Sequence, residues 1–128
     1  MKRLLCFLLS LALLLSLCGC GMVTVSGDGE AVLRFVYGEE SLSQVLTPEE
    51  AEQVAEIFDQ KILLTDSPSC GFDEDISITI DGQVFAVARD NCGIIQHCDS
   101  GRYFSVSDED ISFIHDLFEQ YGGDFPCI

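Results

Sequence analysis

The sequence predicts an α+β fold, in which a small antiparallel sheet of about five strands packs against two helices. Three observations predict it: a hairpin pattern centred on Asp81-Gly82, and two amphipathic helical patterns that begin after Thr47 and after Ser107. Each helix would present one apolar stripe and the sheet one apolar face. Placing the helices on one face of the sheet buries all of these surfaces together.

The first elements of the domain are a strand and a helix. Residues 31–37 alternate between core-facing and outward positions, which indicates a strand. Thr47 can then cap a helix, Pro48 suits its first turn, and Glu50 completes a capping box. The apolar residues that follow have helical spacing, and we expect this helix to end near Gln60.

The clearest local structure is the β-hairpin in the middle of the sheet. Residues 76–80 alternate strictly and are followed by Asp81-Gly82, a pair typical of type I′ turns. A two-residue loop would place Ile78 opposite Phe85, so that the bulky residues of both strands share one face. The same register pairs Ile80 with Gln83 and Ile76 with Val87.

Three short strands and a second helix complete the predicted domain. Residues 62–65, 93–96 and 102–106 have strand-like composition. Ser107 is the expected cap of the last helix, whose first turn holds acidic residues at the positive end of the helix dipole. An apolar stripe follows, and Gly122 ends it.

Residues 1–19 have the pattern of a signal peptide. Lys2 and Arg3 give a positive start, and residues 4–18 form an apolar run of 15 residues. A helix that spans a bilayer needs about 20 such residues, so the run is short for an uncleaved anchor, the alternative interpretation.

The end of this segment, Leu17-Cys18-Gly19-Cys20, resembles the lipobox of bacterial lipoproteins. In that family a large aliphatic residue lies three positions before an invariant cysteine, and a small residue lies one position before it. Cys18 departs mildly, because alanine, serine or threonine is commoner there. The resemblance covers the first 20 residues and implies that Cys20 carries diacylglycerol at the chain's new N-terminus. It implies a lipid-anchored protein on the extracytoplasmic side of the cell membrane, with residues 20–30 as a tether to a domain over residues 31–128.

An ordinary cleaved signal, which would release a soluble protein, is the alternative. Cleavage of that kind favours small residues at both flanking positions, and Leu17 does not fit.

The predicted mature protein is strongly acidic. All 22 Asp and Glu residues follow position 20, and two of the six Lys and Arg residues precede it, so the formal charge is 4 − 22 = −18. Such a domain is repelled by nucleic acid and by anionic headgroups, which excludes a nucleic-acid partner. The charge is explained by solubility alone or by a cationic ligand, and both interpretations stay open.

Four cysteines remain in the domain: Cys70, Cys92, Cys98 and Cys127. An even number in a small exported domain predicts two disulfides. Extending the hairpin register brings Cys70 beside Cys92, although strict pleating would direct them to opposite faces unless the strand is irregular near Gly71. Cys98 would then pair with Cys127. Free thiols are the alternative.

Two sharper hypotheses use the same residues. Cys92, His97 and Cys98 with a distant cysteine could ligate a metal ion, but their spacing is not that of common zinc sites. Cys98 could act as a nucleophile with His115 as its base, whereas a Cys-x-x-Cys redox motif is absent from the sequence.

No catalytic or cofactor motif occurs in the sequence. The acidic clusters at residues 73–75 and 108–110 lack the spaced ligands of a calcium loop, and no glycine-rich phosphate loop occurs. The sequence therefore favours a non-enzymatic module that binds a protein, a peptide or a small molecule at the cell surface. The alternative is a Cys/His metal-binding or thiol-redox lipoprotein.

Overall fold

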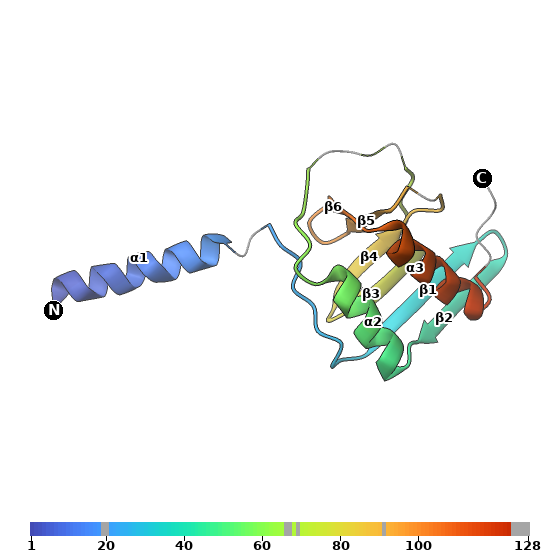
Figure 1. The fold of residues 1–128 in the computed structure, drawn as a ribbon, viewed down its shortest axis with the longest axis horizontal. Helices are drawn as coiled ribbons and strands as arrows, with labels where there is room; N and C mark the ends of the chain where they lie inside the picture. Colours follow the sequence, from blue (N-terminus) through green and yellow to red (C-terminus); the bar gives the residue numbers. More distant parts are fainter. Residues whose placement is uncertain (19–20, 66–67, 69, 91, 124–128) are drawn as a thin grey trace.

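The computed structural model describes residues 1–18, 21–65, 68, 70–90 and 92–123 of the chain. An N-terminal helix precedes a domain in which strands and helices are mixed (Figure 1). The elements are, in chain order, α1 (Lys2–Cys18), β1 (Ala31–Tyr37), β2 (Glu40–Val45), α2 (Pro48–Phe58), β3 (Ile76–Ile80), β4 (Gln83–Val87), β5 (Ile94–His97), β6 (Arg102–Ser105) and α3 (Asp108–Gln120).

The strands form one antiparallel sheet in the order β2-β1-β3-β4-β5-β6. The predicted α+β class is confirmed, but the sheet has six strands rather than about five. Strand β2 is not expected from the sequence, because Glu-Ser-Leu-Ser-Gln-Val is mostly polar and lacks an alternation of bulky apolar side chains. It forms because Gly38, at a φ of 62°, turns the chain back onto β1.

The short strand expected at residues 62–65 is replaced by two single pairings with different partners. Ile62 pairs with Met22, and Leu64 pairs with Tyr103 of β6. The Leu64 N–H donates to the Tyr103 carbonyl at 2.7 Å, and the Tyr103 N–H donates to the Leu64 carbonyl at 3.0 Å. This segment therefore lies along the outer edge of β6.

The hairpin between β3 and β4 has the predicted register. Ile78 pairs with Phe85, and Ile80 pairs with Gln83. Both residues of the turn have positive φ, at 51° and 71°, as a type I′ turn requires. Local turn chemistry and the apolar pattern thus specify the same pairing.

Helices α2 and α3 cover one face of the sheet (Figure 1), and the core lies between them and the strands. Phe58 of α2 contacts Phe85 and Phe104, with ring centroids 4.6 Å and 5.5 Å away. Phe118 of α3 lies 6.2 Å from Phe35 of β1. All five rings are buried, so aromatic packing joins both helices to the sheet.

The predicted helix starts are confirmed. Thr47 and Glu50 form a reciprocal capping box, with donor–acceptor distances of 3.0 Å and 3.2 Å, and Ser107 caps α3 by accepting a main-chain N–H of the first turn. Glu50 also accepts a hydrogen bond from the Tyr121 hydroxyl, which ties the start of α2 to the end of α3. Burial raises the pKa of Glu50, but the hydrogen bonds from Tyr121 and Thr47 outweigh it and hold the pKa below its usual value.

The segment before β1 contributes to the domain. Val23 and Val25 are buried members of the core. The Val23 N–H donates to the Lys61 carbonyl at 2.9 Å, and the Val23 carbonyl accepts the Gln60 N–H at 2.8 Å. Part of the segment that the sequence predicts as a tether, residues 20–30, is therefore packed on the domain.

Helix α1 extends away from the domain (Figure 1). Its side chains at residues 2–11 are exposed, including Leu4 and Phe7 at 70% and 80% of their full surface. Among the described helices, none combines the length and the apolar character needed to cross a membrane.

Candidate functional site

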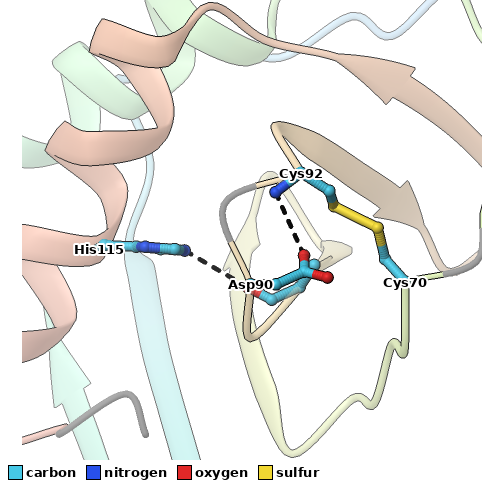
Figure 2. Close-up of a disulfide and its surroundings, with 5 residues drawn as sticks. Cys70, Asp90, Cys92 and His115 are labelled. Carbon is cyan, nitrogen blue, oxygen red and sulfur yellow. Dashed lines mark hydrogen bonds between the residues drawn. A yellow bond between two sulfur atoms is a disulfide. The ribbon is translucent and has the colours of Figure 1, made fainter. Parts of the chain in front are cut away.

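Cys70 and Cys92 form the disulfide expected from the hairpin register (Figure 2). It joins the segment that enters β3 to the segment that follows β4, and the two cysteines are 22 positions apart in the sequence. Asp90 lies beside it and accepts the Cys92 N–H at 3.2 Å (Figure 2). Asp90 lies two positions before Cys92 in the sequence, but its residue type gives no sign that its side chain lies beside the disulfide.

A small cavity of about 270 Å³ opens next to this disulfide. Phe72, Asp73, Arg89 and Asp90 contribute to its lining, so one aromatic, two acidic and one basic residue meet there. The Arg89 guanidinium also lies over the Tyr37 ring, 4.8 Å from its centroid. The cavity is smaller than most sites for drug-sized ligands, which span about 300–1,000 Å³.

Among the described His, Cys, Asp and Glu residues, one group brings its ligand atoms close enough to share a metal ion. Its members are Cys70, Asp90 and Cys92, whose sulfur and carboxylate atoms lie within 4.8 Å of one another. The predicted metal set of Cys92, His97 and Cys98 is therefore not the one that the fold assembles. Asp90 takes the place expected for His97 and Cys98.

His97 faces the helix-covered side of the sheet, where its ring lies 5.3 Å from that of Phe85. Its Nδ1 is 2.7 Å from the Ser100 hydroxyl, and its Nε2 is 2.9 Å from the Gln83 side-chain oxygen. The Asp99 carboxylate is farther from Nε2, at 3.8 Å. A serine–histidine–acid set needs the acid on the second ring nitrogen, but here a neutral amide is closer, so His97 serves to hold the β5–β6 turn.

Cys98 follows His97 along the chain and lies on the opposite face of the sheet. Its thiol is half-buried and forms no disulfide with a described cysteine, and the predicted partner Cys127 lies outside the described residues. Burial raises the pKa of the Cys98 thiol, and the nearby carboxylates of Glu74 and Asp99 raise it further. These surroundings disfavour the thiolate that a nucleophile or a metal ligand requires.

His115 and Cys98 lie near opposite ends of β4. The Cys98 N–H donates to the Val84 carbonyl at 3.0 Å, whereas the His115 Nε2 lies 3.3 Å from the Ala88 carbonyl (Figure 2). Four residues along a strand correspond to about 13 Å. Burial lowers the pKa of His115. The fold therefore does not assemble the predicted nucleophile–base pair.

The outer edge of β2 is the second feature that offers a site. Main-chain groups in an antiparallel strand alternate in direction. The Leu46 N–H donates to Ala31 of β1 at 2.9 Å, so Leu42 and Gln44 also direct their main-chain groups toward β1. The intervening residues direct theirs away from the sheet; they are Ser41, Ser43 and Val45, and we call this set the open edge.

In the described part of the chain, no strand pairs with the open edge. The Val45 carbonyl accepts the Gln44 side-chain amide at 2.9 Å, and the three residues are exposed. The other end of the sheet is different, because Leu64 occupies the outward N–H and carbonyl of Tyr103 in β6. Sequence patterns do not reveal this difference, since it depends on strand order.

The domain is thus an acidic antiparallel α+β domain with one disulfide among its described residues and one sheet edge open. The chain matches no protein-family model, no curated protein and no solved structure.

Proposed function

We propose that this chain is a lipid-anchored lipoprotein on the extracytoplasmic side of the membrane, and that its acidic domain is a binding module without catalytic activity. The Cys70–Cys92 disulfide supports export, because such bonds persist mainly in oxidising compartments. The apolar side chains of α1 are exposed, which supports the proposal that this helix is a signal segment recognised by the membrane or by the secretion machinery. Cys20, the proposed acyl acceptor, lies outside the described residues.

The observation that carries the binding role is the open edge. An unpaired strand edge presents main-chain donors and acceptors to any extended segment that reaches it. Natural edges are commonly protected by lysine, proline or a bulge, and β2 contains no lysine or proline and pairs with β1 over six consecutive residues without a bulge. The contacts of His97 and the raised pKa of the Cys98 thiol argue against catalysis by these residues.

Replacing Cys20 by alanine is expected to abolish acylation and release the protein from the membrane. The measurement is metabolic labelling of the full chain with a radioactive or clickable fatty acid, followed by fractionation of a bacterial expression host. Diacylglycerol supplies two chains, enough for stable attachment, whereas one chain gives reversible binding. Cys18→Ala is the matched control and should leave the label in place.

Retention of the label in Cys20→Ala, or loss of it in Cys18→Ala, would contradict the anchor. The non-catalytic role has its own test. The proposal of a non-catalytic role is wrong if the purified protein converts a substrate and this activity is lost in Cys98→Ala or His115→Ala.

A thiol-dependent metal site is the second candidate function, and the Cys70, Asp90 and Cys92 group favours it. A dithiol reductant would supply two electrons and two protons, the S–S bond would break, and two thiols would form. A zinc ion would then displace both thiol protons and bind two sulfurs and the Asp90 carboxylate. Two thiolates on one zinc ion lie about 3.8 Å apart, so the two sulfurs, which are bonded to each other here, would have to move apart after reduction.

Zinc titration of the full chain, before and after reduction by a phosphine, tests this candidate. We expect the reduced protein to bind one zinc ion, Asp90→Asn to bind about tenfold more weakly, and Cys98→Ala to bind normally. Equal zinc binding by the oxidised protein, or its loss in Cys98→Ala, would reject the site.

A further inference from the structure

We propose that the open edge of β2 accepts an extended, cationic peptide segment of a partner protein, which adds to the sheet as a further strand next to β2. The inference rests on the proposed function in taking the domain to be a binding module, and it names the place and the kind of partner.

Geometry makes the edge suitable for strand addition. Ser41 and Ser43 direct both an N–H and a carbonyl outward, and Val45 directs an N–H outward. The side chains of Ser41 and Ser43 are small and exposed, so they leave room for a neighbouring strand. Val45 is 52% exposed and adds apolar surface at one end of the edge.

Charge selects the kind of partner. Residues 35–60, which include β2 and α2, contain seven Asp and Glu residues and no Lys or Arg. Arg34 of β1 pairs with Ser43, but its guanidinium forms an ion pair with Asp75 at 2.9 Å, which offsets its charge. Glu39 and Glu40 lie where β2 begins, and Glu49 and Glu50 lie in the first turn of α2 soon after it ends. The carboxylate of Glu50 already accepts hydrogen bonds from Thr47, Gln120 and Tyr121, so Glu39, Glu40 and Glu49 are the acids that lysine or arginine side chains of an added segment would complement.

The same charge disfavours a second copy of the chain as the occupant. Two mature chains would each bring a formal charge of −18, by the count of 4 bases and 22 acids after position 20. Strand pairing through β2 would bring two strongly acidic domains together, with Glu39 and Glu40 at the start of each β2 strand, and repulsion between like charges opposes this pairing. A cationic segment pays no such penalty.

The test uses the full chain in non-ionic detergent and a short fluorescent peptide of alternating lysine and threonine, measured by fluorescence anisotropy. Threonine favours an extended backbone, and lysine supplies the charge. Ser43→Pro removes an outward N–H and blocks the edge, but it leaves the hydrogen bonds to β1 intact, because those of residue 43 point away from β1. Ser43→Ala is the matched control, since it keeps the main-chain N–H.

We expect the peptide to bind the native chain, Ser43→Pro to weaken binding at least about tenfold, and Ser43→Ala to change it less than about twofold. A peptide N-methylated throughout its central residues should bind as weakly as Ser43→Pro binds the unmodified peptide. This arm leaves the protein unchanged, so it holds even where the proline variant fails to fold. A peptide with glutamate in place of lysine should not bind.

The inference is overturned if Ser43→Pro binds the unmodified peptide as tightly as the native chain does and the native chain binds the N-methylated peptide equally tightly. Surface charge alone would then attract the peptide. Equal binding of the glutamate peptide would overturn the selection for cations. If the native chain forms a dimer and the Ser43→Pro variant is a monomer, a second copy of the chain occupies the edge, and the inference of a cationic partner is overturned. Acyl labelling of the same preparation is independent: a labelled protein that binds no lysine peptide contradicts the edge inference and leaves the anchor standing.

Discussion

Replacing Phe58 by alanine is expected to lower the free energy of unfolding by about 4 kcal/mol, within the range of about 3–5 kcal/mol for a buried phenylalanine. The Phe58 side chain is 0% exposed and contacts the rings of both Phe85 and Phe104. Alanine would leave a cavity and remove two aromatic contacts at once. Because small domains have a stability of about 5–15 kcal/mol, the change removes a large part of it.

Equilibrium unfolding in urea, followed by circular dichroism of the full chain in non-ionic detergent, measures the effect. Ile62→Ala is the matched control, because the Ile62 side chain is 69% exposed and its removal should cost less than about 0.5 kcal/mol. The loss of unfolding free energy in Phe58→Leu should lie between the losses in Ile62→Ala and Phe58→Ala. A loss below about 1 kcal/mol for Phe58→Ala would mean that Phe58 does not join α2 to the sheet as described.

Removing the Cys70–Cys92 disulfide is expected to cost about 3 kcal/mol. The bond closes a loop in which the cysteines are 22 residues apart, and the chain-entropy relation for such a loop gives this value. The loop contains β3 and β4, the hairpin in the middle of the sheet, so the crosslink restricts the unfolded chain across its central pairing. The double variant Cys70→Ser with Cys92→Ser avoids leaving one unpaired thiol.

The same urea titration compares this double variant with the native chain, and Cys98→Ala serves as its control. Intact mass after thiol alkylation confirms the state of the cysteines, because each disulfide lowers the mass by about 2 Da and protects two thiols. An unfolding midpoint unchanged in the double variant would show that the disulfide contributes nothing to stability. A native chain alkylated at Cys70 and Cys92 would show that the pair is reduced.

Local chemistry accounts for the elements that the sequence predicts correctly. The capping box at Thr47 and the cap at Ser107 are satisfied within one helical turn, and the Asp81-Gly82 turn fixes its hairpin register within a few residues. The elements that the sequence does not predict depend on contacts between residues far apart in the chain. Strand β2 is stabilised by pairing with β1 and not by its own polar sequence, so its pattern carries little signal.

The candidate site divides in the same way. The hairpin register brings Cys70 near Cys92, because that register is local, and the bond can form because both cysteines lie outside β3 and β4 and need not follow the pleat. Residue type makes Cys92, His97 and Cys98 a candidate metal set although their spacing is unlike that of common zinc sites, and the structure places Asp90 at the disulfide instead.

The α+β class, the helix caps, the central hairpin and the acidic charge can be predicted from the sequence, since each depends on composition or on residues close in the chain. The sixth strand, the place of Asp90 at the disulfide and the open edge of β2 emerge from the fold, because they depend on contacts between distant segments. Strand order sets which main-chain groups stay unpaired, and strand order depends on contacts between segments far apart in the sequence.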